Sequence, residues 1–135
     1  MELDGEDELV DLFSDETYIE NTGLFIDGVW GTKTTSRLQE LLDITVTGVI
    51  TGQPNSLRGN TLGTGSGWGW TSPSRAKPDD TLLLLQLELS VPTTGFMDLQ
   101  TINALSQLVG LNKYKLDPEL VKAIQTELNK DGFLL

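Results

Sequence analysis

One stretch decides the fold: Gly28-Val-Trp-Gly-Thr-Lys-Thr-Thr-Ser-Arg-Leu-Gln-Glu-Leu-Leu42. It recurs later in the chain, in weaker form, as Gly95-Phe-Met-Asp-Leu-Gln-Thr-Ile-Asn-Ala-Leu-Ser-Gln-Leu-Val109. In both copies a glycine precedes one large apolar residue, and apolar side chains then follow at the three- and four-residue spacing of a helix. Glycine tolerates a positive φ, so it permits a tight turn before that helix. The two copies therefore predict an internal repeat.

A glutamine that precedes a glycine at a fixed interval supports a second alignment of the repeat. Gln39 precedes Gly48 by the same interval that separates Gln86 from Gly95. Each unit is expected to be a helix that ends in Leu-Gln, a turn at the glycine, and a second helix. We predict a mainly α fold, with two degenerate helical repeats and a long Gly/Trp-rich loop between them.

The repeats divide the chain into three parts. Residues 1–22 are expected to form an acidic N-terminal arm that packs on the body or, alternatively, a solvated tail. Residues 23–110 hold the tandem repeats, and Asp98 is a candidate helix cap there. Residues 111–135 hold a C-terminal helix that begins at Asp117-Pro118, and Ile124-Gln125 can begin a truncated third repeat. Within the segment 44–77, Thr45-Val-Thr-Gly-Val-Ile-Thr51 can be a short strand-like or extended piece. Irregular loops of this length are usually functional or disordered.

Composition restricts the chemistry. The chain has no histidine and no cysteine, which excludes a Ser-His-Asp triad, a cysteine nucleophile, and histidine or thiolate metal sites. With 20 acidic and 9 basic residues the formal net charge is −11. This charge disfavours nucleic acid and anionic membrane surfaces as partners, and it suits a neutral or zwitterionic glycan better. The sequence has no run of apolar residues long enough for membrane insertion.

The first copy carries a recognisable motif. Asp27-Gly-Val-Trp-Gly-x-x-Thr-x-x-x-Leu-Gln39 resembles the small helical peptidoglycan-binding domain. Together with Val46-Thr-Gly-Val-Ile-Thr-Gly-Gln53 it resembles the tandem cell-wall-binding repeats at the C-termini of endolysins from phages of Gram-positive bacteria. The likeness is close over residues 23–53 and weaker over 78–110, where Thr94-Gly-Phe-Met-Asp98 replaces the fuller pattern.

The resemblance implies a wall-targeting fragment or a separately made binding subunit, not an enzyme. Bacterial cell-wall glycan is then the expected ligand, and a full-length lysin or a second copy of the chain is a further candidate partner. The acidic N-terminus is not a secretory signal, so we expect synthesis in the host cytoplasm and action at the cell wall. Most motif residues are assigned to the scaffold: Asp27, Gly28, Trp30, Gly31, Thr34, Leu38, Gln39, Gly48 and Gly95.

The best ligand-binding candidates are Trp68 and Trp70. Alternate residues of an extended segment point to the same side, so the two indoles can stack on sugar rings. Alternatively, both indoles anchor the loop to the body. Candidate hydrogen-bonding residues are Tyr18, Arg58, Asn60 and Arg75, and either arginine can also pair with a carboxylate of the wall polymer.

No cofactor or metal is expected, because the acidic clusters lack the spacing of a calcium loop and the glycine run lacks the lysine of a phosphate loop. The main alternative to wall binding is an oligomeric phage assembly protein that uses the repeats only as scaffold. A carboxylate-only glycosidase is the third hypothesis, but no pair of acids stands out for that role.

Overall fold

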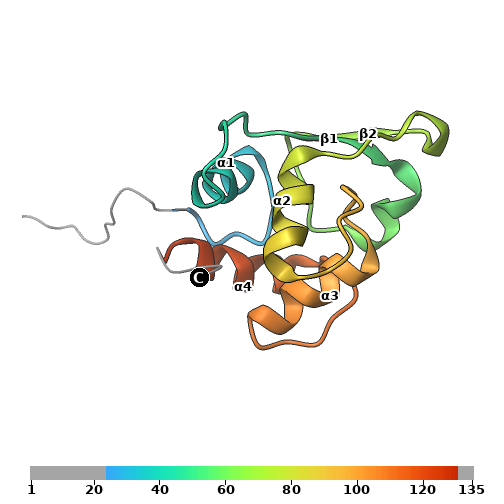
Figure 1. Ribbon diagram of the computed structural model, residues 1–135. Helices are drawn as coiled ribbons and strands as arrows, with labels where there is room; N and C mark the ends of the chain where they lie inside the picture. Colours follow the sequence, from blue (N-terminus) through green and yellow to red (C-terminus); the bar gives the residue numbers. More distant parts are fainter. Residues whose placement is uncertain (1–23, 131–135) are drawn as a thin grey trace, which may run out of the picture.

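The fold is seen in a computed structural model that describes residues 24–130 (Figure 1). Its α-helices are α1 (Thr32–Leu41), α2 (Asp80–Leu89), α3 (Leu99–Leu108) and α4 (Pro118–Leu128). Two strands, β1 (Ile50–Pro54) and β2 (Trp68–Thr71), and two 3-10 helices, η2 (Asn55–Asn60) and η3 (Pro73–Arg75), lie between α1 and α2. The acidic arm predicted over residues 1–22 lies outside the described residues.

The predicted fold class is wrong, because the fold is mixed α/β and not mainly α. β1 and β2 pair in parallel, with Ile50 beside Trp68 and Gln53 beside Trp70. They belong to the stretch between the repeats that was expected to be a long loop, although residues 45–51, which overlap the start of β1, were expected to be strand-like or extended. Strands of four and five residues carry little periodic signal. Their pairing depends on a partner distant in sequence, which local patterns do not reveal.

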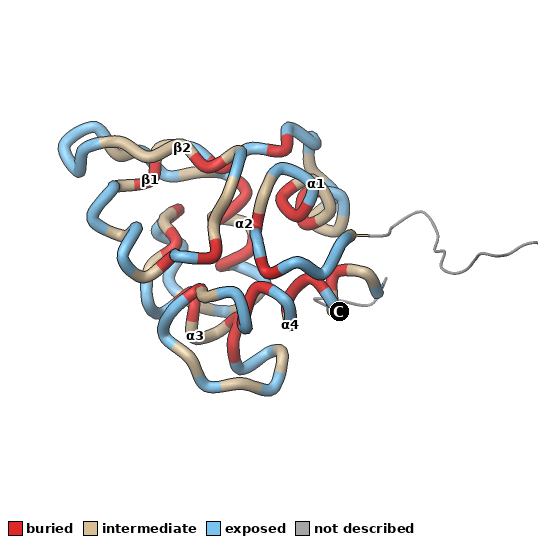
Figure 2. The backbone as a smooth tube through the Cα atoms, turned by 180° about the vertical axis from the view of Figure 1, so that it is seen from behind, coloured by how far each residue is buried: buried red, intermediate tan, exposed pale blue. Residues whose placement is uncertain are grey.

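The prediction of two repeats is also wrong, because equivalent positions recur in all four α-helices. Each helix buries two adjacent residues and, one turn later, two more. Figure 2 shows these buried segments on each of the labelled helices. The sets are Thr34, Thr35, Leu38 and Gln39 in α1; Thr81, Leu82, Leu85 and Gln86 in α2; Thr101, Ile102, Leu105 and Ser106 in α3; and Leu120, Val121, Ile124 and Gln125 in α4.

Aspartates begin three of these helices. The side chains of Asp79, Asp98 and Asp117 accept hydrogen bonds from the first turns of α2, α3 and α4. The caps predicted at Asp98 and Asp117 are therefore confirmed. α1 begins after Gly31, where no side chain among the described residues caps the helix.

A buried glutamine joins the end of α1 to the start of α2. The Gln39 Oε1 atom accepts hydrogen bonds from the backbone N–H groups of Thr47 and Gly48, each at 2.9 Å. The Nε2 atom donates to Thr81 Oγ1 at 3.0 Å. Buried N–H groups need such partners, so Gln39 holds the turn and ties it to α2.

The same arrangement recurs around the molecule. Gln86 links α2 to α3, because its amide bonds to the Gly95 N–H and the Thr101 hydroxyl, each at 2.8 Å. Gln125 links α4 to the turn before α1 in the same way, through the Gly28 N–H and the Thr34 hydroxyl, each at 3.1 Å. Between α3 and α4, the Ser106 hydroxyl accepts from the Lys113 N–H at 2.7 Å. The four helices therefore form a closed ring, in which the last helix holds the segment before the first.

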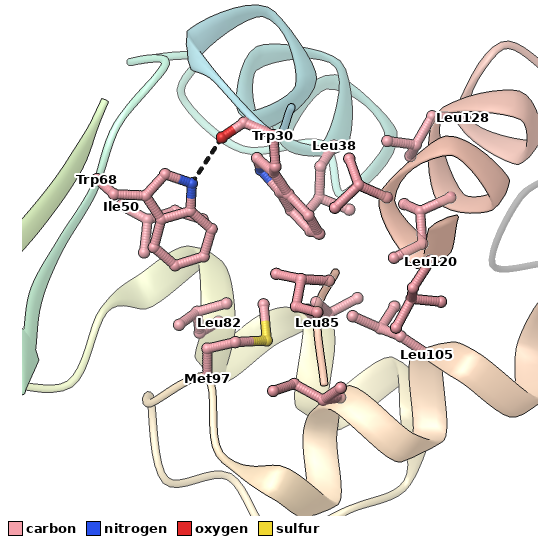
Figure 3. Close-up of a cluster of buried hydrophobic side chains, with 14 residues drawn as sticks. Trp30, Leu38, Ile50, Trp68, Leu82, Leu85, Met97, Leu105, Leu120 and Leu128 are labelled. Carbon is pink, nitrogen blue, oxygen red and sulfur yellow. Dashed lines mark hydrogen bonds between the residues drawn. The ribbon is translucent and has the colours of Figure 1, made fainter. Parts of the chain in front are cut away.

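Residues 51–77 cross this ring and carry part of its core. The segment hydrogen-bonds to buried residues just before α1, α3 and α4, through the pairs Trp30–Gly63, Met97–Gln53 and Leu116–Gly63, and to the start of β1 through Ile50–Gly67. Trp30 is fully buried, and Trp68 packs edge-on against it at 5.7 Å between ring centroids. Figure 3 shows these two indoles above leucines from the helices. The inserted segment is thus structural as well as a connection.

Candidate functional site

A hollow lies at the junction between α1 and α2, and we call it groove 1. Its volume is about 640 Å³. One wall is the extended segment 44–51 that follows α1, and the other is the start of α2. Its lining residues are Gln39, Ile44, Thr45, Thr47, Val49, Thr51, Pro78, Asp79, Asp80, Thr81, Leu83 and Leu84.

A second hollow, groove 2, lies where the segment before α1 meets α4 and the start of α1. Its volume is about 400 Å³. It is lined by Leu24, Phe25, Asp27, Val29, Gly31, Thr32, Lys33, Thr34, Ser66 and Gln125. Residues 24–31 form one wall and the first turn of α1 forms the other, so the arrangement of elements is that of groove 1.

The two grooves are built from equivalent residues. Ile44, Thr45, Thr47, Val49 and Thr51 of groove 1 correspond in order to Leu24, Phe25, Asp27, Val29 and Gly31 of groove 2. On the helical wall Asp79, Asp80 and Thr81 correspond to Thr32, Lys33 and Thr34. Gln39 and Gln125 take the same place at the base. One local construction therefore presents two similar concave surfaces.

The walls of groove 1 combine hydroxyl groups with aliphatic surface. Thr45, Thr47 and Thr51 are exposed, and Val49 is 40% exposed. The Thr47 hydroxyl already hydrogen-bonds to Gln39 Nε2 at 3.0 Å. Such a surface can accept a polar ligand through hydroxyls while an apolar face of that ligand rests on the valine.

The carboxylates of the two grooves are held differently. In groove 1 the Asp79 side chain accepts from the N–H groups of Thr51 and Thr81, each at 2.9 Å. In groove 2 the backbone N–H of Val29, followed by the amide of Gln125, holds the pKa of Asp27 below its ordinary value. Both aspartates therefore serve the scaffold of their groove.

The outer rims differ in charge. Asp80, exposed on the first turn of α2, is replaced by Lys33 at the equivalent position of α1. Within the described range 24–130, Lys33 makes no ion pair. Groove 1 consequently carries two acidic groups at its helical wall, whereas groove 2 carries one cation there.

The structure brings together three of the residues proposed from sequence as ligand-binding. Trp68 and Trp70 stack with their ring centroids 5.7 Å apart and their planes at 13°. The guanidinium of Arg58 lies 5.3 Å from the Trp70 ring centroid. Only 9% of Trp68 is exposed, and its indole N–H donates to Trp30 O at 2.9 Å. Trp68 thus lies in the core, and Trp70 is half-buried beside it.

The remaining ligand-binding candidates from the sequence are Arg75, Asn60 and Tyr18. Arg75 is exposed on η3, and Asn60 ends η2, where its carbonyl accepts from the Leu116 N–H at 2.8 Å. Tyr18 lies outside the described residues. Neither Arg75 nor Asn60 lines either groove.

Sequence reasoning missed both grooves. The two walls of groove 1 come from segments separated by residues 52–77, so their proximity is not visible in the sequence. One signal was present, because Thr-Gly-Val at 47–49 repeats the Asp-Gly-Val at 27–29. Aligning those two turns, and not only the two longest stretches, points to a repeated surface.

Comparisons of the chain with protein-family models, with curated proteins and with solved structures found no match. Within residues 24–130, no group of three or more acidic residues is placed to hold a metal ion. In the same range, no helix has both the length and the apolar character needed to cross a membrane.

Proposed function

We propose that this protein is a non-catalytic module that binds the glycan of the bacterial cell wall and targets a phage lysin to a Gram-positive host. The observation that carries the proposal is groove 1, a concave surface of hydroxyl and aliphatic groups that is repeated at a second helix junction. The sequence resemblance to endolysin wall-binding repeats points to the same ligand.

The size and chemistry of groove 1 suit a short stretch of sugar chain. Its volume of about 640 Å³ falls within the range of small-molecule sites. Threonine hydroxyls can exchange hydrogen bonds with sugar hydroxyls, and Val49 with Pro78 offers apolar surface to a ring face. Asp79 and Asp80 repel anionic groups, which favours an uncharged sugar in this groove.

The acidic pair in groove 1 is not arranged for hydrolysis. Glycosidases hold two carboxylates on opposite sides of the scissile bond, but Asp79 and Asp80 are neighbours on one wall. Both Asp79 oxygens already accept backbone N–H groups. This geometry supports binding without catalysis.

The test is retention of the 135-residue chain on purified sacculi from a panel of Gram-positive bacteria, before and after removal of teichoic acid. Val49→Asp introduces a charge into groove 1, and we expect it to weaken binding at least about tenfold, because a desolvated charge without a partner is costly. Val46→Asp is the matched control, since Val46 is similarly exposed in the same segment but does not line the groove.

Three results decide the matter. Binding that survives teichoic-acid removal and is lost only in Val49→Asp supports the proposal. Equal loss in both variants excludes groove 1 as the binding surface. Failure of the unmodified chain to bind any sacculus overturns wall binding itself.

The second candidate function is assembly with a partner or with further copies of the chain. Several apolar side chains are exposed on the described surface, with Leu62 at 70% and Leu87 at 64%. Light scattering over a concentration series measures the mass directly, and a stable oligomer together with no wall binding would favour this function.

A further inference from the structure

Groove 2 repeats the construction of groove 1 with one reversal of charge. We propose that groove 2 is a second sugar subsite and that it selects a unit carrying a carboxylate, whereas groove 1 selects a neutral unit. This inference rests on the proposed function, and it assigns a different ligand chemistry to each groove.

The first step is the equivalence of the two scaffolds. In each groove a buried glutamine amide accepts a hydrogen bond from the N–H of a turn glycine and donates one to a threonine hydroxyl on the helical wall. In groove 1 Gln39 bonds to Gly48 and Thr81. In groove 2 Gln125 bonds to Gly28 and Thr34. In each groove a half-exposed valine lines the turn, Val49 at 40% and Val29 at 49%. Surfaces built in the same way should accept ligands of similar size and shape.

The second step is the difference in charge. Lys33 occupies the place of Asp80 on the helical wall, and within residues 24–130 it forms no ion pair. Asp27, the other charged group in groove 2, keeps its negative charge, and its Oδ1 atom accepts from the Val29 N–H and the Gln125 amide. Groove 2 therefore combines one carboxylate on the segment 24–31 with one lysine on the helical wall, whereas groove 1 has two carboxylates and no cation in its lining. Lys33 is thus the group in these two grooves that can attract an anion.

The third step is the context of the whole chain. With a net charge of −11, the protein repels free anions at long range. A carboxylate therefore gains from groove 2 only at short range, when the rest of the same sugar is already in the groove. This favours a carboxylated sugar over a small inorganic anion. Groove 2 also holds the aromatic ring of Phe25, which is 78% exposed and suited to a sugar face.

The test uses two soluble probes that differ mainly in one carboxylate-bearing substituent, N,N′-diacetylchitobiose and the N-acetylglucosamine–N-acetylmuramic acid disaccharide. Both are titrated into the isotope-labelled 135-residue chain, and backbone amide shifts report which groove is occupied. We expect the neutral probe to shift amides of 44–51 and the acidic probe to shift amides of 24–34. Added salt should weaken the binding of the acidic probe but not of the neutral one, because salt screens the charge contact with the lysine.

Charge exchange provides the decisive variants. Lys33→Asp should weaken binding of the acidic probe about two- to fivefold and leave binding of the neutral probe unchanged, the effect expected for one surface charge contact. Asp80→Lys should bring the acidic probe into groove 1. Lys115→Asp, a reversal at an exposed position outside both grooves, is the matched control for net charge.

The outcomes separate the two proposals. If both probes shift only groove 1 amides, or if Lys33→Asp and Lys115→Asp act alike, the second subsite is overturned while wall binding stands. If neither probe shifts any amide of the two grooves and sacculi also fail to retain the chain, both proposals fall.

Discussion

Removal of the Gln125 side chain tests whether the ring of helices is closed by hydrogen bonds. The Gly28 N–H and the Thr34 hydroxyl both lie in buried residues, and both bond to the Gln125 amide at 3.1 Å. In Gln125→Ala these two groups lose that partner, at about 1–3 kcal/mol each. The Asp27 N–H and the Val29 carbonyl belong to exposed residues and can turn to water. We therefore expect a loss of about 2–6 kcal/mol, a large share of an ordinary domain stability of about 5–15 kcal/mol.

Urea unfolding followed by tryptophan fluorescence measures this loss. Trp30 and Trp68 lie in the core, so their emission changes when the ring opens. Gln100→Ala is the matched control, because Gln100 is exposed on α3 and its side chain makes no hydrogen bond within the described part of the chain. It should change the free energy of unfolding by less than about 0.5 kcal/mol. Gln125→Met retains most of the side-chain volume without the amide, so it separates hydrogen bonding from packing.

Two results would refute the reasoning. If Gln125→Met restores the stability of the unmodified chain, volume and not hydrogen bonding holds the junction. If Gln125→Ala unfolds at the same urea concentration as Gln100→Ala, the hydrogen bonds of Gln125 contribute nothing to the stability of the fold.

Three further predictions address the turns, the tryptophans and pH. Gly95 and Gly110 share a positive φ, but a Cβ on Gly95 would meet the backbone and ring of Pro78, whereas a Cβ on Gly110 would face open space. In urea unfolding, Gly95→Ala should therefore lower the free energy of unfolding by at least about 1–3 kcal/mol more than Gly110→Ala. Equal losses would argue against the close approach at Gly95. Trp68→Ala should lower stability by about 3–5 kcal/mol because the ring is buried, whereas Trp70→Ala should cost clearly less, and thermal melts that rank them the other way would contradict this placement. Because its pKa is lowered in the folded state, Asp27 stabilises the fold above the usual aspartate pKa of about 3.9, and this contribution disappears as pH falls through the lower folded value. The difference in unfolding free energy between the unmodified chain and Asp27→Asn should therefore be present at neutral pH and close in acid. A difference that stays constant would contradict the shift.

Much of the local structure was predictable from sequence alone. Apolar spacing marked the helices, and aspartates at 98 and 117 marked two of their starts, because capping and helical periodicity depend on neighbours along the chain. The equal glutamine-to-glycine interval was visible as a repeat register, and the structure shows its cause: Gly48 N–H donates to Gln39 and Gly95 N–H donates to Gln86. These bonds join residues that one short loop separates.

Tertiary structure alone decided the rest. The pairing of β1 with β2, the burial of Trp68 and the bond from Gln125 to Gly28 join segments that lie far apart in the chain. Groove 1 arises in the same way, since its two walls come from segments that are far apart in the chain, and groove 2 needs Gln125 of α4 to hold its turn. Local propensity carries no information on such contacts, because their stability comes from apolar burial and satisfied polar groups in the assembled core. The sequence by itself thus determined the helices and turns, and packing determined which surfaces they form together.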